Sequence, residues 1–444
     1  MPTQLTFRHV LTPGGMLHDQ TLVVGSDGRI ERIEPAAGRR PDGFLALPGM
    51  PNAHSHAFQR AMAGYGERAE GEDSFWSWRE AMYRLANAID AEDMYAIARR
   101  AFVDMLRGGF TSVAEFHYVH HGRDGRRGPE MGQAVIAAAR DTGIRLVMLP
   151  VLYQRGGFEQ AASPAQARFL HETVTSYIYL IESLHGAPRG IAPHSLRAVP
   201  VTVLPQLLEG ARYALGEDFP VHIHVAEQRG EVEKCLAVHG CRPIELLART
   251  VKLDARWTLV HATHASDAER ALILESGATV ALCPITEAYL GDGFFAADEF
   301  VRAGGRLALG SDSNCRVDAL EELRWLEFGQ RLRQERRARL ATERGLGGPL
   351  WDGCARAGAA ALRQPVGALE PGRHADLVVF DETAAPFAGH GPDTLLDALV
   401  INGTARDIAA VYVGGRRIVD HGGHAADQAI TDAFDRVVRR IYGT

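Results

Sequence analysis

Short apolar runs alternate with amphipathic segments over most of the chain. The apolar runs have the length of strands and lie at residues 44–47, 111–116, 145–151, 190–193, 220–225, 257–260, 278–282 and 306–309. Between most of them, apolar residues recur with the period of a helix, for example at residues 93–107, 132–142, 164–184, 203–215, 265–275 and 318–339. Strands that alternate with helices in this way predict a closed parallel (β/α)8 barrel. A doubly wound open sheet is the alternative, but no glycine-rich dinucleotide fingerprint follows any of the strands.

The two ends of the chain have a different pattern. Residues 5–10, 21–24 and 30–33 read as short strands, and strand-like runs return at residues 375–380, 408–413 and 416–419. The simplest account is one small β domain that is built from both termini, with the barrel inserted between them. We therefore predict an α/β fold: a distorted TIM barrel at residues 47–365 and a discontinuous β-sandwich domain made of residues 1–46 and 366–444.

Composition narrows the classes of partner. The net charge of −7 argues against nucleic acid or an anionic membrane as the main partner. No stretch approaches the roughly 18 apolar residues that a membrane span needs, and the N-terminus lacks the features of a signal peptide. The five cysteines show no Cys-x-x-Cys spacing, which disfavours disulfides and indicates a reducing, cytoplasmic location.

Two histidines close to the first barrel strand are candidate metal ligands. His54 and His56 are two positions apart, so on an extended segment both imidazoles point to one face. The pair alone is a weak signal, since two unrelated histidines can have this spacing. Its place at the carboxyl end of a strand strengthens it, because the active sites of such barrels lie at that end.

Further chemistry-bearing residues end later strands. His222 and His224 lie on the predicted fifth strand with Glu227 just beyond it, His261 ends the sixth, and Asp312 follows the eighth. We interpret His222 as a histidine that is hydrogen-bonded within the barrel. The others would meet at one end of a barrel, where imidazole and carboxylate groups can hold a metal ion and move protons.

This ordered set resembles the amidohydrolase superfamily. The resemblance implies one divalent metal ion, zinc, on His54, His56, His224 and Asp312. It implies catalytic roles for Glu227, His261 and Asp312, and Glu227 three residues after His224 resembles the deaminase branch. Members with two metals usually carry a lysine at the end of the fourth strand. Residues 192–195 read Ala-Pro-His-Ser, which favours a single ion.

Within that branch the chain resembles the formimidoylglutamate deiminases of histidine degradation. The resemblance is carried by residues 54–62, 75–79, 115–118, 192–197 and 222–228. It implies that metal-bound hydroxide attacks the formimino carbon of N-formimino-L-glutamate, which yields N-formyl-L-glutamate and ammonia. It also implies a homodimer and a pocket for a small dianionic substrate, lined by Gln59, Arg79, Tyr118, His194 and Arg197. Arginine suits that task because its planar fork matches a carboxylate.

Two other functions stay open at this point. One is a related deaminase that acts on a nucleobase or a guanidino compound, whose pocket would favour apolar or amide contacts over two arginines. The other is a non-catalytic metal- or metabolite-binding protein, which we expect to lack Glu227, His261 or Asp312. All three residues are present.

Overall fold

A parallel barrel forms the larger part of the computed structural model, which describes residues 2–67 and 75–443. Its strands are β5 (Met50–Ser55), β6 (Phe110–His117), β7 (Arg145–Leu152), β8 (Ala192–Pro193), β9 (Val221–Val225), β10 (Trp257–His261), β11 (Thr279–Leu282) and β12 (Arg306–Leu309). They pair in the order β8-β7-β6-β5-β12-β11-β10-β9, and isolated bridges from Ile191 to Val221 and from Ser195 to His224 connect the two ends. The predicted barrel is therefore confirmed.

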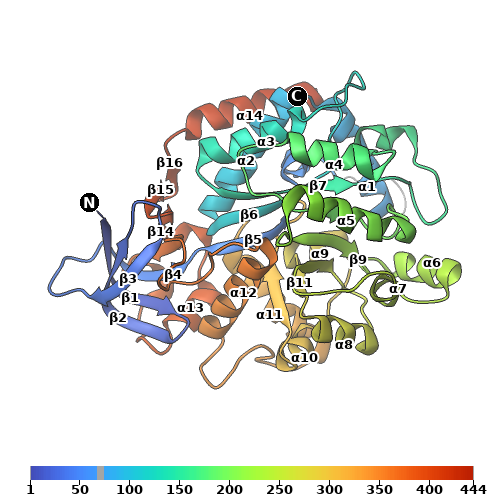
Figure 1. The fold of residues 1–444 in the computed structure, drawn as a ribbon. Coiled ribbons are helices and arrows are strands. Elements are labelled where there is room, and N and C mark those ends of the chain that lie inside the picture. Colours follow the sequence, from blue (N-terminus) through green and yellow to red (C-terminus); the bar gives the residue numbers. More distant parts are fainter. Residues whose placement is uncertain (1, 68–74, 444) are drawn as a thin grey trace.

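Helices surround the strands (Figure 1). They are α1 (Phe75–Ala88), α2 (Ala91–Arg107), α3 (Glu130–Thr142), α4 (Val174–Ser183), α5 (Leu204–Leu215), α6 (Arg229–His239), α7 (Pro243–Thr250), α8 (Asp267–Ser276), α9 (Pro284–Leu290), α10 (Ala297–Arg302), α11 (Ala319–Gln334) and α12 (Gly347–Leu362). None of the helices in the described part of the chain combines the length and the hydrophobicity that a bilayer crossing requires.

Strands from both termini form the second sheet. They are β1 (Thr3–Thr12), β2 (Gly15–Val24), β3 (Ile30–Pro35), β4 (Gly43–Pro48), β13 (Leu377–Phe380), β14 (Ile408–Val413), β15 (Arg416–Asp420) and β16 (Gly423–His424). The order is β16-β15-β14-β13-β4-β1-β2-β3, and every pairing is antiparallel except that of β1 with β4. The sheet encloses its own small core, which includes Phe7, Leu22 and Val379. The division into residues 1–46 plus 366–444 and residues 47–365 stays a prediction.

The apolar run at residues 44–47 does not belong to the barrel. It lies in β4, which pairs with β1 and β13 of the terminal sheet, and the first barrel strand, β5, starts at Met50. Gly49 connects the two strands. A Cβ atom there would lie 2.2 Å from Thr111 Oγ1, so the chain passes from sheet to sheet with no room for a side chain. The expected assignment was wrong because an apolar run shows that a strand is buried, but not which sheet it joins.

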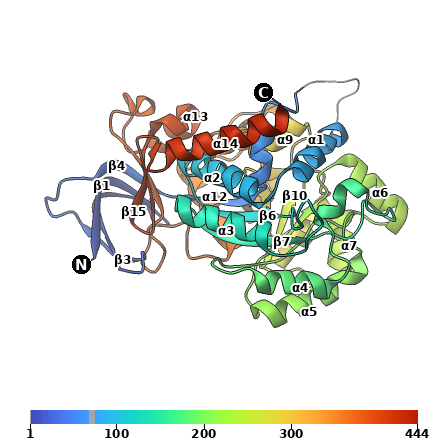
Figure 2. The ribbon, with the colours of Figure 1, turned by 90° about the horizontal axis from the view of Figure 1, so that it is seen from above.

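The predicted helices also needed correction. The segment at residues 164–184 is divided into a 3₁₀ turn, Pro164–Phe169, and α4, whose N-cap is Thr173. The helix expected at residues 318–339 ends at Gln334, because Glu335 takes a left-handed conformation with φ of 54°. Near the C-terminus, the structure has two helices for which the pattern gave no prediction, α13 (Leu395–Asn402) and α14 (Asp427–Tyr442). Helix α14 packs against α2 of the barrel (Figure 2).

Candidate metal centre and active site

Strands β5 and β12 are adjacent, and this places the first ligands next to Asp312. The backbone N–H groups of Ser311 and Asp312 both donate to the carbonyl oxygen of His54 at 3.0 Å. The side-chain amide of Asn314 donates to the carbonyl oxygens of His56 and Asp312, both at 3.0 Å. Asp312 itself has a left-handed backbone with φ of 44°. The loop after β12 is thus fastened to β5, with the Asp312 carboxylate facing the histidines.

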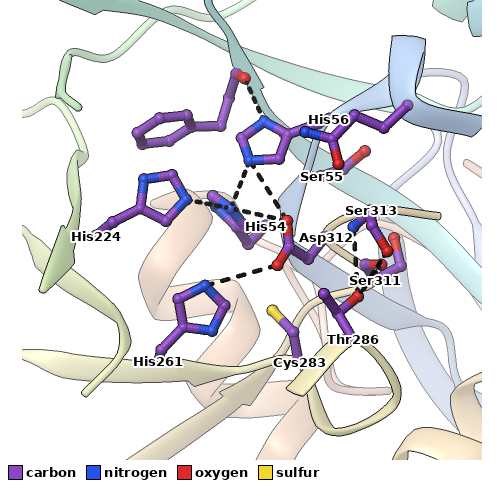
Figure 3. Close-up of polar contacts among 12 residues, drawn as sticks. His54, Ser55, His56, His224, His261, Cys283, Thr286, Ser311, Asp312 and Ser313 are labelled. Carbon is purple, nitrogen blue, oxygen red and sulfur yellow. Dashed lines mark hydrogen bonds and ion pairs between the residues drawn. The ribbon is translucent and has the colours of Figure 1, made fainter. Parts of the chain in front are cut away.

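Three imidazoles converge at the mouth of the barrel (Figure 3). The Nε2 atom of His54 lies 3.2 Å from that of His56 and 3.0 Å from that of His224. The Oδ1 atom of Asp312 lies 3.4 Å from His56 Nε2 and 3.7 Å from His54 Nε2. All four side chains are buried. The four predicted metal ligands, which come from three strands, therefore surround one point.

The hydrogen bonds of the rings show that this cluster fits a cation. Nδ1 of His56 donates to the carbonyl oxygen of Phe116 at 2.9 Å, and Nδ1 of His224 donates to that of His194 at 3.0 Å. In a neutral ring this leaves Nε2 with a lone pair directed at the other imidazoles. Burial lowers the pKa of His56 to about 3, so the ring stays neutral at physiological pH. Lone pairs that face one another at 3 Å are stabilised by a positive ion between them.

His261 lies beside this cluster among carboxylates. Its Nε2 atom is 3.6 Å from Asp312 Oδ2 and 3.9 Å from Glu227 Oε1, and its Nδ1 atom is 3.2 Å from Glu287 Oε1. Burial opposes the charged ring, but the carboxylates outweigh it and raise the pKa of His261 to about 10. Burial also raises the pKa of Asp312 to about 7. The site therefore combines groups that can take up a proton with groups that can release one.

The predicted substrate-binding residues line one cavity with the metal cluster. Gln59, Arg79, Tyr118, His194 and Arg197 share its wall with His56, His224, Glu227, His261 and Asp312. His54 does not line the cavity itself, but it contacts His56 and His224, which do. Every residue predicted for the site is therefore brought together.

Two contacts order the polar wall of the cavity. The side-chain amide of Gln59 donates to the Tyr118 hydroxyl at 2.8 Å. The guanidinium of Arg197 lies 3.6 Å from Glu227 and 3.9 Å from Glu231. Although burial lowers it, these two carboxylates hold the pKa of Arg197 above its usual value. Arg197 is therefore a permanent positive charge beside Glu227.

Sequence reasoning missed several residues of this site. Glu287, the partner of His261, lies on α9, and Tyr83 and Tyr153 also line the cavity. None of them belongs to a spacing that signals chemistry. Cys283 is also buried here, and its sulfur lies within 4.8 Å of ligand atoms of His261 and Asp312. His222 Nε2 donates to the Ala361 carbonyl oxygen at 2.9 Å, which confirms that this histidine is hydrogen-bonded within the barrel.

Comparisons with known proteins agree with this geometry. Residues 45–418 match the model of the Amidohydrolase family. Formimidoylglutamate deiminase of Pseudomonas aeruginosa is 44% identical over 97% of this chain and 98% of its own length. An amidohydrolase structure from Brucella melitensis has a TM-score of 0.91 at 39% identity and covers 99% of both chains. An adenosine deaminase from Xanthomonas campestris, solved with bound zinc, shares the fold with a TM-score of 0.81 at 23% identity, covering 99% of this chain and 98% of its own.

The family match spans most of the chain, and the Pseudomonas relative aligns along nearly the whole length of both proteins. Members of the family bind a divalent metal, and the chain has a buried cluster suited to one. The chain therefore belongs to the amidohydrolase family, as a homologue of formimidoylglutamate deiminase and a hydrolase of C–N bonds.

Proposed function

We propose that this enzyme hydrolyses N-formimino-L-glutamate to N-formyl-L-glutamate and ammonia. The observation that carries the proposal is the pair of arginines, Arg79 and Arg197, in the same cavity as the metal cluster. A dicarboxylate substrate needs two cationic anchors, and arginine binds carboxylates with paired, charge-assisted hydrogen bonds. The relative that is 44% identical bears the name of this activity.

We propose His54, His56, His224 and Asp312 as the ligands of one divalent ion. Zinc suits three imidazole nitrogens and a carboxylate, and a structural neighbour was solved with zinc bound. When bound, such an ion lowers the pKa of a water molecule from about 15.7 toward roughly 7–9. The ring nitrogens keep their orientation because the carbonyl groups of Phe116 and His194 hold the opposite sides of two rings.

The chain's own residues then move the protons. Asp312, whose Oδ2 atom lies 3.6 Å from His261 Nε2, accepts the proton of the attacking water. Glu227 carries a proton to the departing nitrogen, which then leaves as ammonia rather than as an amide anion. His261, 3.6 Å from Asp312 and 3.9 Å from Glu227, orients the attacking water and stabilises the tetrahedral intermediate.

Gln59, Tyr118 and His194 complete the substrate site in this proposal. Gln59 donates to the Tyr118 hydroxyl, which fixes both side chains at the cavity wall. The ring of His194 packs edge-on against that of Tyr118 with centroids 5.9 Å apart. Together with the two arginines they surround the substrate with hydrogen-bonding groups. The homodimer, the cytoplasmic location and a role in histidine degradation stay predictions from the resemblance.

A related deaminase of a nucleobase or guanidino compound is the second candidate. An 8-oxoguanine deaminase of Pseudomonas aeruginosa is 27% identical over 96% of this chain and of its own length. A substrate with two carboxylates can add charge-assisted hydrogen bonds to both arginines of the cavity, whereas a neutral base cannot. The dicarboxylate is therefore the better fit. A non-catalytic binding protein is excluded by membership of a hydrolase family together with the presence of Glu227, His261 and Asp312.

The test is ammonia release by the zinc-loaded protein from N-formimino-L-glutamate, beside N-formimino-L-aspartate, guanine and cytosine. We expect rapid release from the glutamate compound, loss of activity on chelation and its return with zinc. Turnover of a nucleobase instead would retain the metal site and Glu227 but refute the dicarboxylate pocket. Activity that survives complete removal of metal would refute the metal assignment.

A further inference from the structure

Two tyrosines outside the assigned substrate set face the same cavity. Tyr83 lies on α1 and Tyr153 directly follows β7, and both line the cavity with Arg79 and Arg197. The two phenol rings are almost fully buried. Their hydroxyl oxygens meet at one amide: Gln166 Nε2 lies 3.0 Å from the Tyr83 oxygen and 2.6 Å from the Tyr153 oxygen.

The direction of these hydrogen bonds follows from the partner of the Gln166 side-chain oxygen. Gln166 Oε1 accepts the backbone N–H of Ser163 at 2.8 Å, so Nε2 must be the atom that faces the tyrosines. An amide nitrogen only donates, and both phenol oxygens therefore accept. The hydrogens of the two hydroxyl groups must then be donated elsewhere.

The two hydroxyl oxygens lie side by side on the same amide nitrogen, so one hydroxyl can donate to the other and use one of these hydrogens. Within residues 2–67 and 75–443, no protein acceptor is recorded for the second hydrogen. A buried O–H group without an acceptor costs free energy. The structure therefore holds one O–H donor at the cavity wall for which a ligand can be the acceptor.

The surroundings of this donor are positively charged. The guanidinium carbon of Arg79 lies 5.5 Å from the centre of the Tyr83 ring. Arg197 lines the same cavity as both tyrosines, and the Tyr153 ring packs against His194 with centroids 4.7 Å apart. Burial raises the pKa of Tyr83 above its usual value, so its hydroxyl keeps its proton. The region presents donors and positive charge, which is the environment of a bound carboxylate.

We propose that Tyr83 and Tyr153, oriented by Gln166, donate a hydrogen bond to a carboxylate of the substrate and so select acidic substrates. The inference rests on the proposed function and adds a donor pair to the two arginine anchors. The preference for a carboxylate over a carboxamide follows from the direction of these hydrogen bonds. Both oxygens of a carboxylate accept from the donors around them. The NH2 group of a carboxamide is itself a donor, so it would face an O–H or N–H donor without forming a hydrogen bond.

The test uses Tyr83→Phe, Tyr153→Phe and the double variant, which keep the rings and remove only the oxygens. We expect KM for N-formimino-L-glutamate to rise about 10- to 100-fold in one single variant, the range for one lost hydrogen bond to a charged group, with kcat within about threefold. Only one hydrogen points to the ligand. The KM of the double variant should therefore rise no further than the KM of the single variant that binds the substrate more weakly.

Tyr177→Phe is the matched control. This tyrosine is fully buried and donates to the Pro150 carbonyl oxygen at 2.6 Å, outside the cavity. Loss of the Tyr177 hydroxyl group should lower thermal stability and leave KM unchanged. A wild-type KM in the double variant, or an equal rise of KM in the control, would overturn the proposal.

Calorimetric binding of glutarate, an unreactive dicarboxylate, separates this inference from the substrate assignment. If the wild type binds glutarate and the double variant binds it at least tenfold more weakly, the tyrosine pair is a carboxylate site whatever the enzyme hydrolyses. If the wild type hydrolyses N-formimino-L-glutamate but both proteins bind glutarate equally, the proposed function stands and this inference fails.

Discussion

Replacing Glu227 by glutamine tests the proton transfer most directly. The substitution keeps the shape of a side chain that lies 3.9 Å from His261 and 3.6 Å from Arg197, and it removes the exchangeable proton and the charge. A positioned acid–base group accelerates a reaction roughly 10²- to 10⁴-fold. At about 1.4 kcal/mol for each tenfold change, the activation barrier should rise by about 2.8–5.6 kcal/mol.

The same substitution should not destabilise the fold. Burial, and after it the charge of Glu227, raise the pKa of Asp292 to about 9, and Glu227 acts in the same direction on Asp312. A neutral side chain at position 227 removes this repulsion but also weakens the attraction to charged His261, while Arg197 keeps Glu231 as a partner. Because these effects oppose each other, we expect a melting temperature close to that of the wild type.

The assay is steady-state ammonia release, with zinc content and thermal melting measured on the same preparations. Glu269→Gln is the matched control, because Glu269 is a fully buried glutamate that binds Arg242 at 2.7 Å outside the cavity. It should lower stability and leave kcat unchanged. A kcat of Glu227→Gln within about threefold of the wild type, at equal zinc content, would refute the role of Glu227 in proton transfer.

Three further predictions concern substrate binding and stability. Arg197→Met should raise KM for N-formimino-L-glutamate at least tenfold more than KM for formamidine, which has no carboxylate, because only the dicarboxylate loses a charged hydrogen bond; equal effects in steady-state kinetics would exclude Arg197 as an anchor. Arg145→Met should lower the free energy of unfolding by about 3–5 kcal/mol, because Asp376 is buried and loses two hydrogen bonds of 2.9 and 3.0 Å; an unchanged urea midpoint would contradict this. Burial lowers the pKa of His117 to about 3 and that of His222 to about 4, from 6.5 in the unfolded chain. The unfolded state therefore binds more protons as the pH falls below about 6.5, and stability should fall by up to about 1.4 kcal/mol per pH unit for each histidine; urea titrations with equal midpoints at pH 7 and pH 5 would refute it.

The proposed metal ligands could be brought together from the sequence because their placement depends on local geometry, and the family resemblance then indicated their role. Positions two apart on a strand share a face, which places His54 and His56 together. The carboxyl ends of parallel barrel strands meet at one mouth, which adds His224 and Asp312 and places His261 beside them. The strand that carries the first pair was misassigned, since the apolar run before Gly49 belongs to the terminal sheet. That error left the site intact because β5 follows at once.

Residue types and their order along the chain thus determined the fold class, and together with the family resemblance they indicated the proposed metal ligands and the polar residues of the cavity. Only the tertiary structure decided which side chains form hydrogen bonds or ion pairs with the residues of the cavity. Glu287 reaches His261 from α9, and Gln166 orients Tyr83 and Tyr153 across 83 and 13 residues of sequence. Periodicity and strand order are local or topological properties, so a sequence carries them directly. A hydrogen bond depends on distances of about 3 Å between segments that only packing brings together.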